Sequence, residues 1–200
     1  MEKEKRKKLT LQITLAAIFT AIVFVLQFFV GSNIRLFGMF TVSATLVPIV
    51  VGAALCGAPV GAWLGLVFGF AVLISGDAAA FLTINPVATI FTVLIKGAAA
   101  GLAAGLIFRL IEKKNRTLAV ITSAVAAPIV NTGLFLIACF LFFMEPVSAW
   151  ATGSGYSNVV AYAFLGLAGI NFIAELVLNV VLCPVILRVI DAARKSISKA

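Results

Sequence analysis

Long apolar runs separated by short polar segments make up most of the chain. They predict helices over residues 10–30, 41–55, 60–74, 85–111, 118–143 and 159–190. A run of about 20 apolar residues is long enough to cross the ~30 Å hydrocarbon core of a bilayer. The run at 41–55 is shorter and contains Pro48, which is typical of a helix that is kinked or does not quite cross. We therefore expect an all-α bundle of six transmembrane helices, with residues 1–200 forming one membrane domain.

Composition and charge agree with an integral membrane protein, because 63% of the residues are hydrophobic and 11% are charged. The first apolar run lacks a small-residue cleavage site, so we expect it to remain as a helix preceded by a charged cytoplasmic lead at residues 1–9. Thirteen of the 15 basic residues fall in three clusters, within residues 3–8, 109–116 and 188–199. The positive-inside rule places all three clusters, and with them both termini, in the cytoplasm.

The same features argue against several other classes of protein. We interpret the net charge of +8 as a signal of membrane topology, so we expect a multi-pass protein of the cell membrane, surrounded by lipid, and no nucleic-acid partner. The chain has no histidine, no GxxxxGK[ST] phosphate loop and three scattered cysteines, Cys56, Cys139 and Cys183. These absences disfavour metal sites, Ser-His catalysis and ATP hydrolysis by this chain. We expect a protein that is not an enzyme, with no catalytic residue, metal or cofactor of its own.

One polar stripe runs along the first half of the helix expected at residues 85–111. Asn85, Thr89, Thr92 and Lys96 occur at offsets 0, 4, 7 and 11, which places them on one helix face. Lys96 lies near the expected midplane, where an ammonium group costs at least ~2.5–3.5 kcal/mol in contact with lipid. It should therefore face protein or water. The alternative is that the threonines bond only their own backbone and that Lys96 extends its ammonium group to the membrane surface. The side chain of Lys96 is short for that distance.

A second stripe lies on the last expected helix, where Asn171, Glu175 and Asn179 occur at offsets 0, 4 and 8. Glu175 lies at a depth similar to that of Lys96, and opposite charges in a membrane usually pair with each other or with a ligand. One interpretation is therefore an ion pair that only sets helix register. The other is a site for a compact polar solute, closed from outside by an arginine and two aromatic residues. The candidate binding residues are Arg35, Asn85, Thr89, Thr92, Lys96, Asn131, Thr132, Trp150, Tyr156, Asn171, Glu175 and Asn179.

Small residues also recur at helical spacing. Glycines occur every fourth residue at 57–69 and again at 97–105, the spacing that lets membrane helices pack closely. Ala17 and Ala21 form a similar pair one turn apart on the first helix.

With these features, the whole chain resembles the S component, the substrate-binding membrane subunit, of an energy-coupling-factor (ECF) vitamin transporter. Ala17-x3-Ala21 looks like the family's motif for docking on the coupling subunit. Residues 45–69 are similar to its proline- and glycine-rich hairpin, and Lys96-Gly97 matches a Lys-Gly pair seen in many members.

The resemblance implies a binding subunit of an ABC-type importer without its own energy source. Its partners would be a vitamin, a transmembrane coupling subunit and two ATPase subunits, which use the ATP. The ligand would lie near the outer face, among the first outer loop and the last three helices; riboflavin and pantothenate are favoured. Two other classes stay open: a stand-alone secondary transporter in which Glu175 carries protons, and a membrane scaffold that transports nothing.

Overall fold

The computed structural model describes residues 2–31, 35–36, 40–41 and 44–199. Its elements are almost all helical: α1 (Glu2–Val25), α2 (Leu46–Cys56), α3 (Ala58–Ser75), α4 (Ala79–Leu82), α5 (Pro86–Ile111), α6 (Arg116–Phe142), α7 (Met144–Gly153), α8 (Val159–Ala161), α9 (Gly169–Val181) and α10 (Cys183–Lys199). Two π-helical segments, η1 (Leu26–Gly31) and η2 (Tyr162–Leu167), continue α1 and α8. The short strands β1 (Arg35–Leu36) and β2 (Phe40–Thr41) pair in antiparallel fashion.

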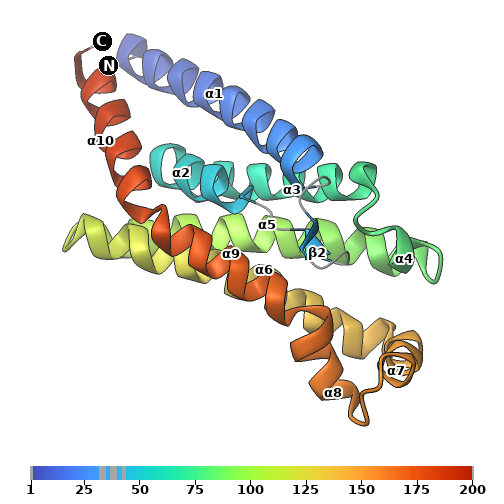
Figure 1. Ribbon diagram of the computed structural model, residues 1–200. Helices are drawn as coiled ribbons and strands as arrows, with labels where there is room; N and C mark the ends of the chain where they lie inside the picture. The colour runs from blue at the N-terminus through green and yellow to red at the C-terminus, as the bar shows by residue number, and fades with distance from the viewer. Residues whose placement is uncertain (1, 32–34, 37–39, 42–43, 200) are drawn as a thin grey trace.

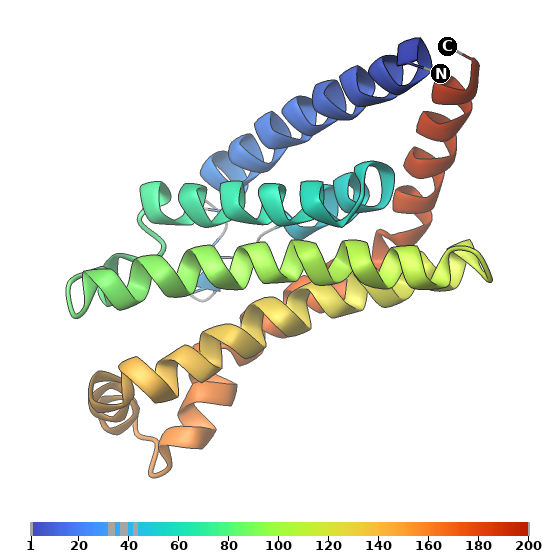
Figure 2. The ribbon, with the colours of Figure 1, turned by 180° about the vertical axis from the view of Figure 1, so that it is seen from behind.

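Helices α3, α5 and α6 lie side by side and form the centre of the bundle (Figures 1 and 2). The short helix α2 packs against α3 and α5, and only Val47 and Leu55 of its 11 residues are not buried. This explains why α2 is apolar on every face. At 1.5 Å per residue α2 is only about 17 Å long, shorter than the ~30 Å hydrocarbon core of a bilayer, as the sequence indicated.

The glycine stripes of α3 and α5 face each other. A Cβ atom added to Gly65 would collide with the carbonyl oxygen of Gly97, and one added to Gly97 would collide with that of Gly65. Gly61 and Gly101 are related in the same way one turn further along. The two backbones are therefore in direct contact, as the spacing of small residues predicted. This contact fixes the rotation of α5 and with it the direction of the neighbouring Lys96.

Among the described residues, four helices are long and apolar enough to cross a membrane: Leu9–Phe29, Ala58–Ser75, Pro86–Ile111 and Arg116–Phe142. A fifth candidate is the pair Val159–Leu167 and Asn171–Val181, which is bent by 41°. The structure thus divides the single helix expected at 159–190. Gly166 and Gly169 flank the first break, and Pro184, which has no N–H to donate, follows the second.

Two further boundaries differ from the sequence-based expectation. The helix expected over 41–55 begins only at Leu46, because Thr41 belongs to β2. The charged lead expected at 1–9 is helical from Glu2 and continues directly into the first span. The polar segment after α6 also contains a helix of its own, α7, which packs against the end of α6.

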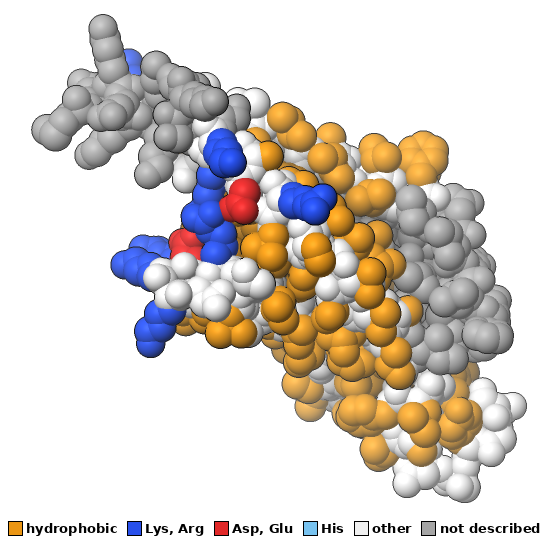
Figure 3. Space-filling model, turned by 60° about the vertical axis from the view of Figure 1, so that its left-hand side comes forward, with side chains coloured by type: hydrophobic (Ala, Val, Ile, Leu, Met, Phe, Trp, Pro, Cys, Tyr) orange, Lys and Arg blue, Asp and Glu red, His pale blue; other side chains and the backbone are white. Residues whose placement is uncertain are grey.

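The first turns of α1, the α5–α6 loop and the end of α10 lie at the same end of the molecule, and α4, α7 and α8 lie at the other (Figures 1 and 2). Figure 3 shows Lys and Arg side chains gathered at one end, beside a flank where hydrophobic side chains predominate. Two ion pairs hold α10 there: Arg194–Glu112 at 2.7 Å and Arg116–Asp191 at 2.6 Å. The three basic clusters thus share one end, as a common membrane side requires.

Candidate functional site

A cavity of about 600 Å³ lies between α5, α6 and α9, with η1, α3, α4, α7 and η2 completing its wall. Eight of the 12 residues that the sequence nominated for binding line it: Thr89, Thr92, Lys96, Asn131, Thr132, Trp150, Asn171 and Glu175. They come from four helices, so the fold brings together the two polar stripes and the polar pair in the middle of α6. The faces of α5 and α9 that would be costly in contact with lipid are turned inward instead.

The other four nominated residues lie elsewhere or outside the described part. The side chain of Arg35 is among those that the structure does not describe. Asn85 is the N-cap of α5, and its side chain accepts a hydrogen bond from Ala88 N at 3.1 Å. Tyr156 packs edge-on against Tyr162, with ring centroids 5.3 Å apart, so it supports a lining residue without lining the cavity itself. Asn179 lies beyond the cavity, where its Nδ2 donates to the Glu175 backbone oxygen at 2.8 Å.

The threonines of the first stripe divide between two roles. The hydroxyl of Thr89 donates to the backbone oxygen of Asn85 at 2.8 Å, so its proton is already used within the helix. Thr89 lines the cavity, and its hydroxyl oxygen is still able to accept a hydrogen bond. Thr92, one turn further along, also lines the cavity. The hydroxyl proton of Thr89 thus bonds only to the backbone of its own helix, as the alternative interpretation expected. The stripe as a whole does not fit that interpretation, because Thr89 and Thr92 also line the cavity.

Lys96 and Glu175 both line the cavity, but these two described side chains form no ion pair. The Lys96 ammonium lies over the ring of Phe135, with Nζ 5.3 Å from the ring centroid. Glu175 is 2% exposed, and its Oε2 has no hydrogen-bond partner among the described residues. The glycine contact fixes α5 against α3, and no ion pair between Lys96 and Glu175 fixes α5 against α9, so both charged groups are able to bond to a solute.

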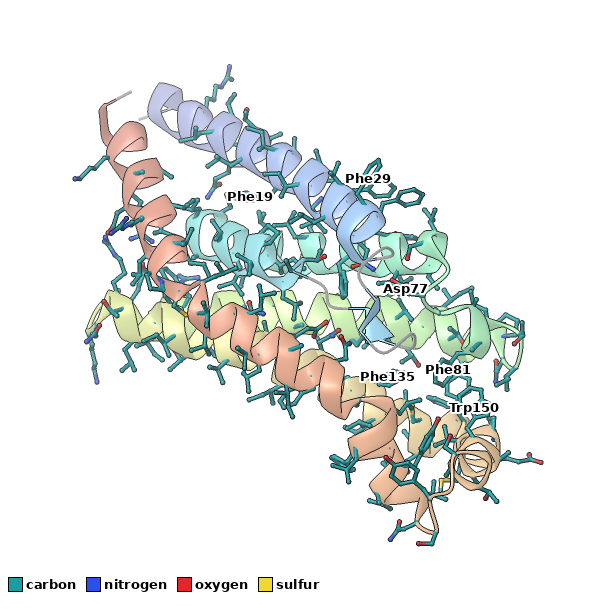
Figure 4. All side chains as sticks on the ribbon, in the orientation of Figure 1. Phe19, Phe29, Asp77, Phe81, Phe135 and Trp150 are labelled. Carbon is teal, nitrogen blue, oxygen red and sulfur yellow. The ribbon has the colours of Figure 1, made fainter. Side chains whose placement is uncertain are left out.

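Phenylalanine side chains, grouped around the predicted Trp150, form a part of the wall that sequence reasoning missed. Phe81 of α4 makes edge-to-face contacts with Phe135, Phe143 and Trp150, at centroid distances of 5.5, 5.0 and 5.3 Å. Figure 4 shows Phe81, Phe135 and Trp150 close together beside α7. The chain has 17 phenylalanines, most of them in apolar runs, and no spacing rule distinguishes these from the ones that face lipid.

A second missed feature connects η1 to the turn after α3. Gln27 is 1% exposed, and its Nε2 donates to Asp77 Oδ2 at 2.7 Å, while the hydroxyl of Ser75 donates to the same oxygen at 3.1 Å. Thr45 donates to Gln27 Oε1 at 3.2 Å. Gln27 and Asp77 both line the cavity. The available signal was Gln27 itself, a lone amide in an otherwise apolar stretch, since such residues in membrane helices usually face the bundle interior.

All the elements that build this cavity lie in the part of the chain that matches a protein-family model. The family model described as "ECF transporter, substrate-specific component" matches residues 11–187, which contain every cavity-lining element. The chain belongs to this family. A search of curated proteins and a search of solved structures found no match. The resemblance seen in the sequence is thereby confirmed, and the chain is an S component; S components are helical membrane subunits of transporters.

In this S component, Ala17 and Ala21 are exposed on the outer face of α1. Their exposed neighbours on the same helix are apolar, among them Ile13, Ile18 and Ile22. Close to this face, Trp63 of α3 donates its indole N–H to the hydroxyl of Thr20 at 3.1 Å. The small-residue pair is therefore not used to pack α1 against its own bundle, which leaves it available for another helix.

Among the described residues, no group of three or more His, Cys, Asp or Glu side chains is placed to hold a metal ion. The chemistry of the cavity is that of recognition: one ammonium, two carboxylates, three side-chain amides and an aromatic wall. Such a mostly apolar cavity with a few converging polar groups is typical of a small-molecule site.

Proposed function

We propose that this S component captures a small vitamin in the cavity between α5, α6 and α9 and delivers it through an energising module. The observation that carries the proposal is the convergence of both intramembrane polar stripes on one cavity of about 600 Å³. Pockets for small ligands are generally of about 300–1,000 Å³, so the volume suits a solute of vitamin size. Family membership supports the role of substrate binding.

Riboflavin and pantothenate are the two vitamins that we favour, and different parts of the wall support each. A flat ring system would lie against Phe81, Phe135 and Trp150, which already form an edge-to-face cluster. A carboxylate would bond to the Lys96 ammonium, whose one described partner is the face of an aromatic ring.

The remaining parts of the proposal concern topology and assembly. We propose six membrane spans in the cell membrane, counting α2 and the bent α8–α9 segment, with both termini in the cytoplasm. The partners would be a transmembrane coupling subunit, docked on the face of Ala17 and Ala21, and two ATPase subunits that supply the energy of ATP hydrolysis. The exposed small-residue pair supports this docking site, because small side chains allow two helix backbones to approach closely.

The experiment is to purify the protein from cells grown in complex medium and to identify released small molecules by mass spectrometry. The wild type should release one solute in roughly stoichiometric amount. Ala138→Phe, which places a ring in the cavity, should release little. Ile137→Phe is the matched control, because Ile137 lies in the same helix turn but is 54% exposed and does not line the cavity. Equal retention by both variants, or an empty wild type, would contradict the proposal.

A further inference from the structure

Three residues that line the cavity each have a buried acceptor atom without a hydrogen-bond partner among the described residues. These are Asn131 Oδ1 on α6, and Asn171 Oδ1 and Glu175 Oε2 on α9; none has a hydrogen-bond partner among the described residues. Asn131 and Glu175 are only 4% and 2% exposed, and all three residues line the cavity. They are contributed by α6 and α9, two helices that pack against each other.

Unpartnered buried acceptors are rare because they lose their bonds to water without replacement. Five such atoms occur among the described residues, and three of them belong to residues that line this one cavity. If a ligand donates N–H or O–H groups to these acceptors, they lack hydrogen bonds, and so destabilise the protein, only while the site is empty. An arrangement that destabilises the empty protein and is satisfied by the ligand is characteristic of a binding site.

The charges in the wall add a second constraint. Among the described lining residues, Asp77 and Glu175 are acidic and Lys96 is basic. Asp77 already accepts two hydrogen bonds at one oxygen, from Gln27 and Ser75. A solute with net negative charge would add a third anion to a largely apolar cavity, where repulsion is weakly screened. The described part of the wall therefore disfavours anions, even though Lys96 alone would attract one.

We infer that the solute carries at least three hydrogen-bond donors, aimed at Asn131, Asn171 and Glu175, and has no net negative charge. This inference rests on the proposed function, and it names the chemical class of the ligand of that same site. Of the two vitamins favoured above, neutral riboflavin with its hydroxyl-bearing chain satisfies it. Pantothenate, with its carboxylate, does not.

The first test works on whatever solute the protein carries, whether or not that solute has been identified. The solute released from the wild-type protein is exchanged into deuterated water and weighed by mass spectrometry, which counts its N–H and O–H hydrogens. Its net charge at pH 7 is measured by electrophoresis. We expect at least three exchangeable hydrogens and a neutral or cationic solute. A solute that is an anion, or that has fewer donors, would overturn the inference and leave the proposed function standing. A protein that binds no solute would overturn both.

The second test separates a binding role from a structural one. In the double variant Asn131→Leu with Asn171→Leu, two unpartnered acceptors are replaced by apolar groups, so the melting temperature of the empty protein should hold or rise. Rebinding of the released solute should weaken at least about tenfold. Ser123→Ala on α6 is the control, because Ser123 Oγ is also buried and unpartnered but does not line the cavity. A lower melting temperature with unchanged affinity would show that the asparagines serve the fold alone.

Discussion

The Lys96 ammonium lies over the Phe135 ring, with Nζ 5.3 Å from the ring centroid, and forms no ion pair with the Glu175 carboxylate. A cation over an aromatic face gains about 0.5–2 kcal/mol, much less than a buried ammonium loses on leaving water. The two charged groups line the same cavity and attract each other through it. Because they form no ion pair, both are able to bond to a solute in the cavity.

The first prediction concerns the contact of α3 with α5. Gly65→Ala should destabilise the protein by about 1–3 kcal/mol, because the new Cβ would collide with the carbonyl oxygen of Gly97 and backbone is unable to move aside cheaply. Solute binding should weaken as well, since the same contact fixes the direction of Lys96. Thermal unfolding in detergent, followed by a binding titration, measures both effects.

Gly133→Ala is the matched control for that substitution. Gly133 lies inside α6, and a Cβ added there meets nothing within 4 Å. Alanine should therefore be tolerated or stabilise by about 0.5–1 kcal/mol through its better helix propensity. Equal melting temperatures for Gly65→Ala and Gly133→Ala would show that the contact of α3 with α5 is looser than described.

The second prediction concerns docking. Ala17→Trp or Ala21→Trp should abolish uptake by cells while the isolated protein binds its solute as before. The reason is steric, because a tryptophan on this exposed face holds another helix away without entering the cavity. Ile137→Trp, on an exposed position of α6, is the control and should leave uptake intact. Loss of binding along with uptake would place Ala17 and Ala21 in the protein's own fold instead.

The third prediction concerns topology. Single cysteines at Thr152 of α7 and Lys114 of the α5–α6 loop should be labelled from opposite sides of intact cells, Thr152→Cys from outside and Lys114→Cys from inside. Both positions are exposed, and the native Cys56, Cys139 and Cys183 are buried, so background labelling should be low. The basis is the positive-inside rule applied to the basic clusters at one end of the bundle. The reverse labelling pattern would place the α7 end of the cavity on the cytoplasmic side and would refute capture of the solute from outside.

Much of the bundle centre follows from pattern alone. The glycines of α3 and α5 occur every fourth residue, and this spacing already indicates a face of close contact. The polar stripes are equally predictable from the sequence, because a charged residue in an apolar membrane helix almost always faces the interior of the bundle. The break within 159–190 was missed, since the apolar run continues through Gly166 and Gly169, and glycine alone does not end a membrane helix.

The site was only partly predictable because several contacts join residues distant in the chain. Gln27 and Asp77 are 50 positions apart, and nothing local to either indicates their hydrogen bond. Asn85 fits the helical spacing of the stripe, yet an asparagine at the first turn serves equally well as an N-cap, which is what it does. The aromatic wall depends on which of many phenylalanines face inward, and that is decided by how whole helices pack.

The fourth prediction tests the central claim, that Lys96 and Glu175 serve a solute and not the fold alone. The single variants are ambiguous, since each leaves one buried charge without its opposite. The double variant Lys96→Met with Glu175→Gln removes both charges and keeps most of the volume. Its melting temperature should match or exceed that of the wild type.

The deciding measurement is an isothermal titration of the released solute into the wild type and into this double variant. We predict that affinity falls by at least ~1.5 kcal/mol, more than tenfold, because a hydrogen bond to a charged group contributes at least that much. Affinity equal to that of the wild type in a stably folded double variant would contradict the account.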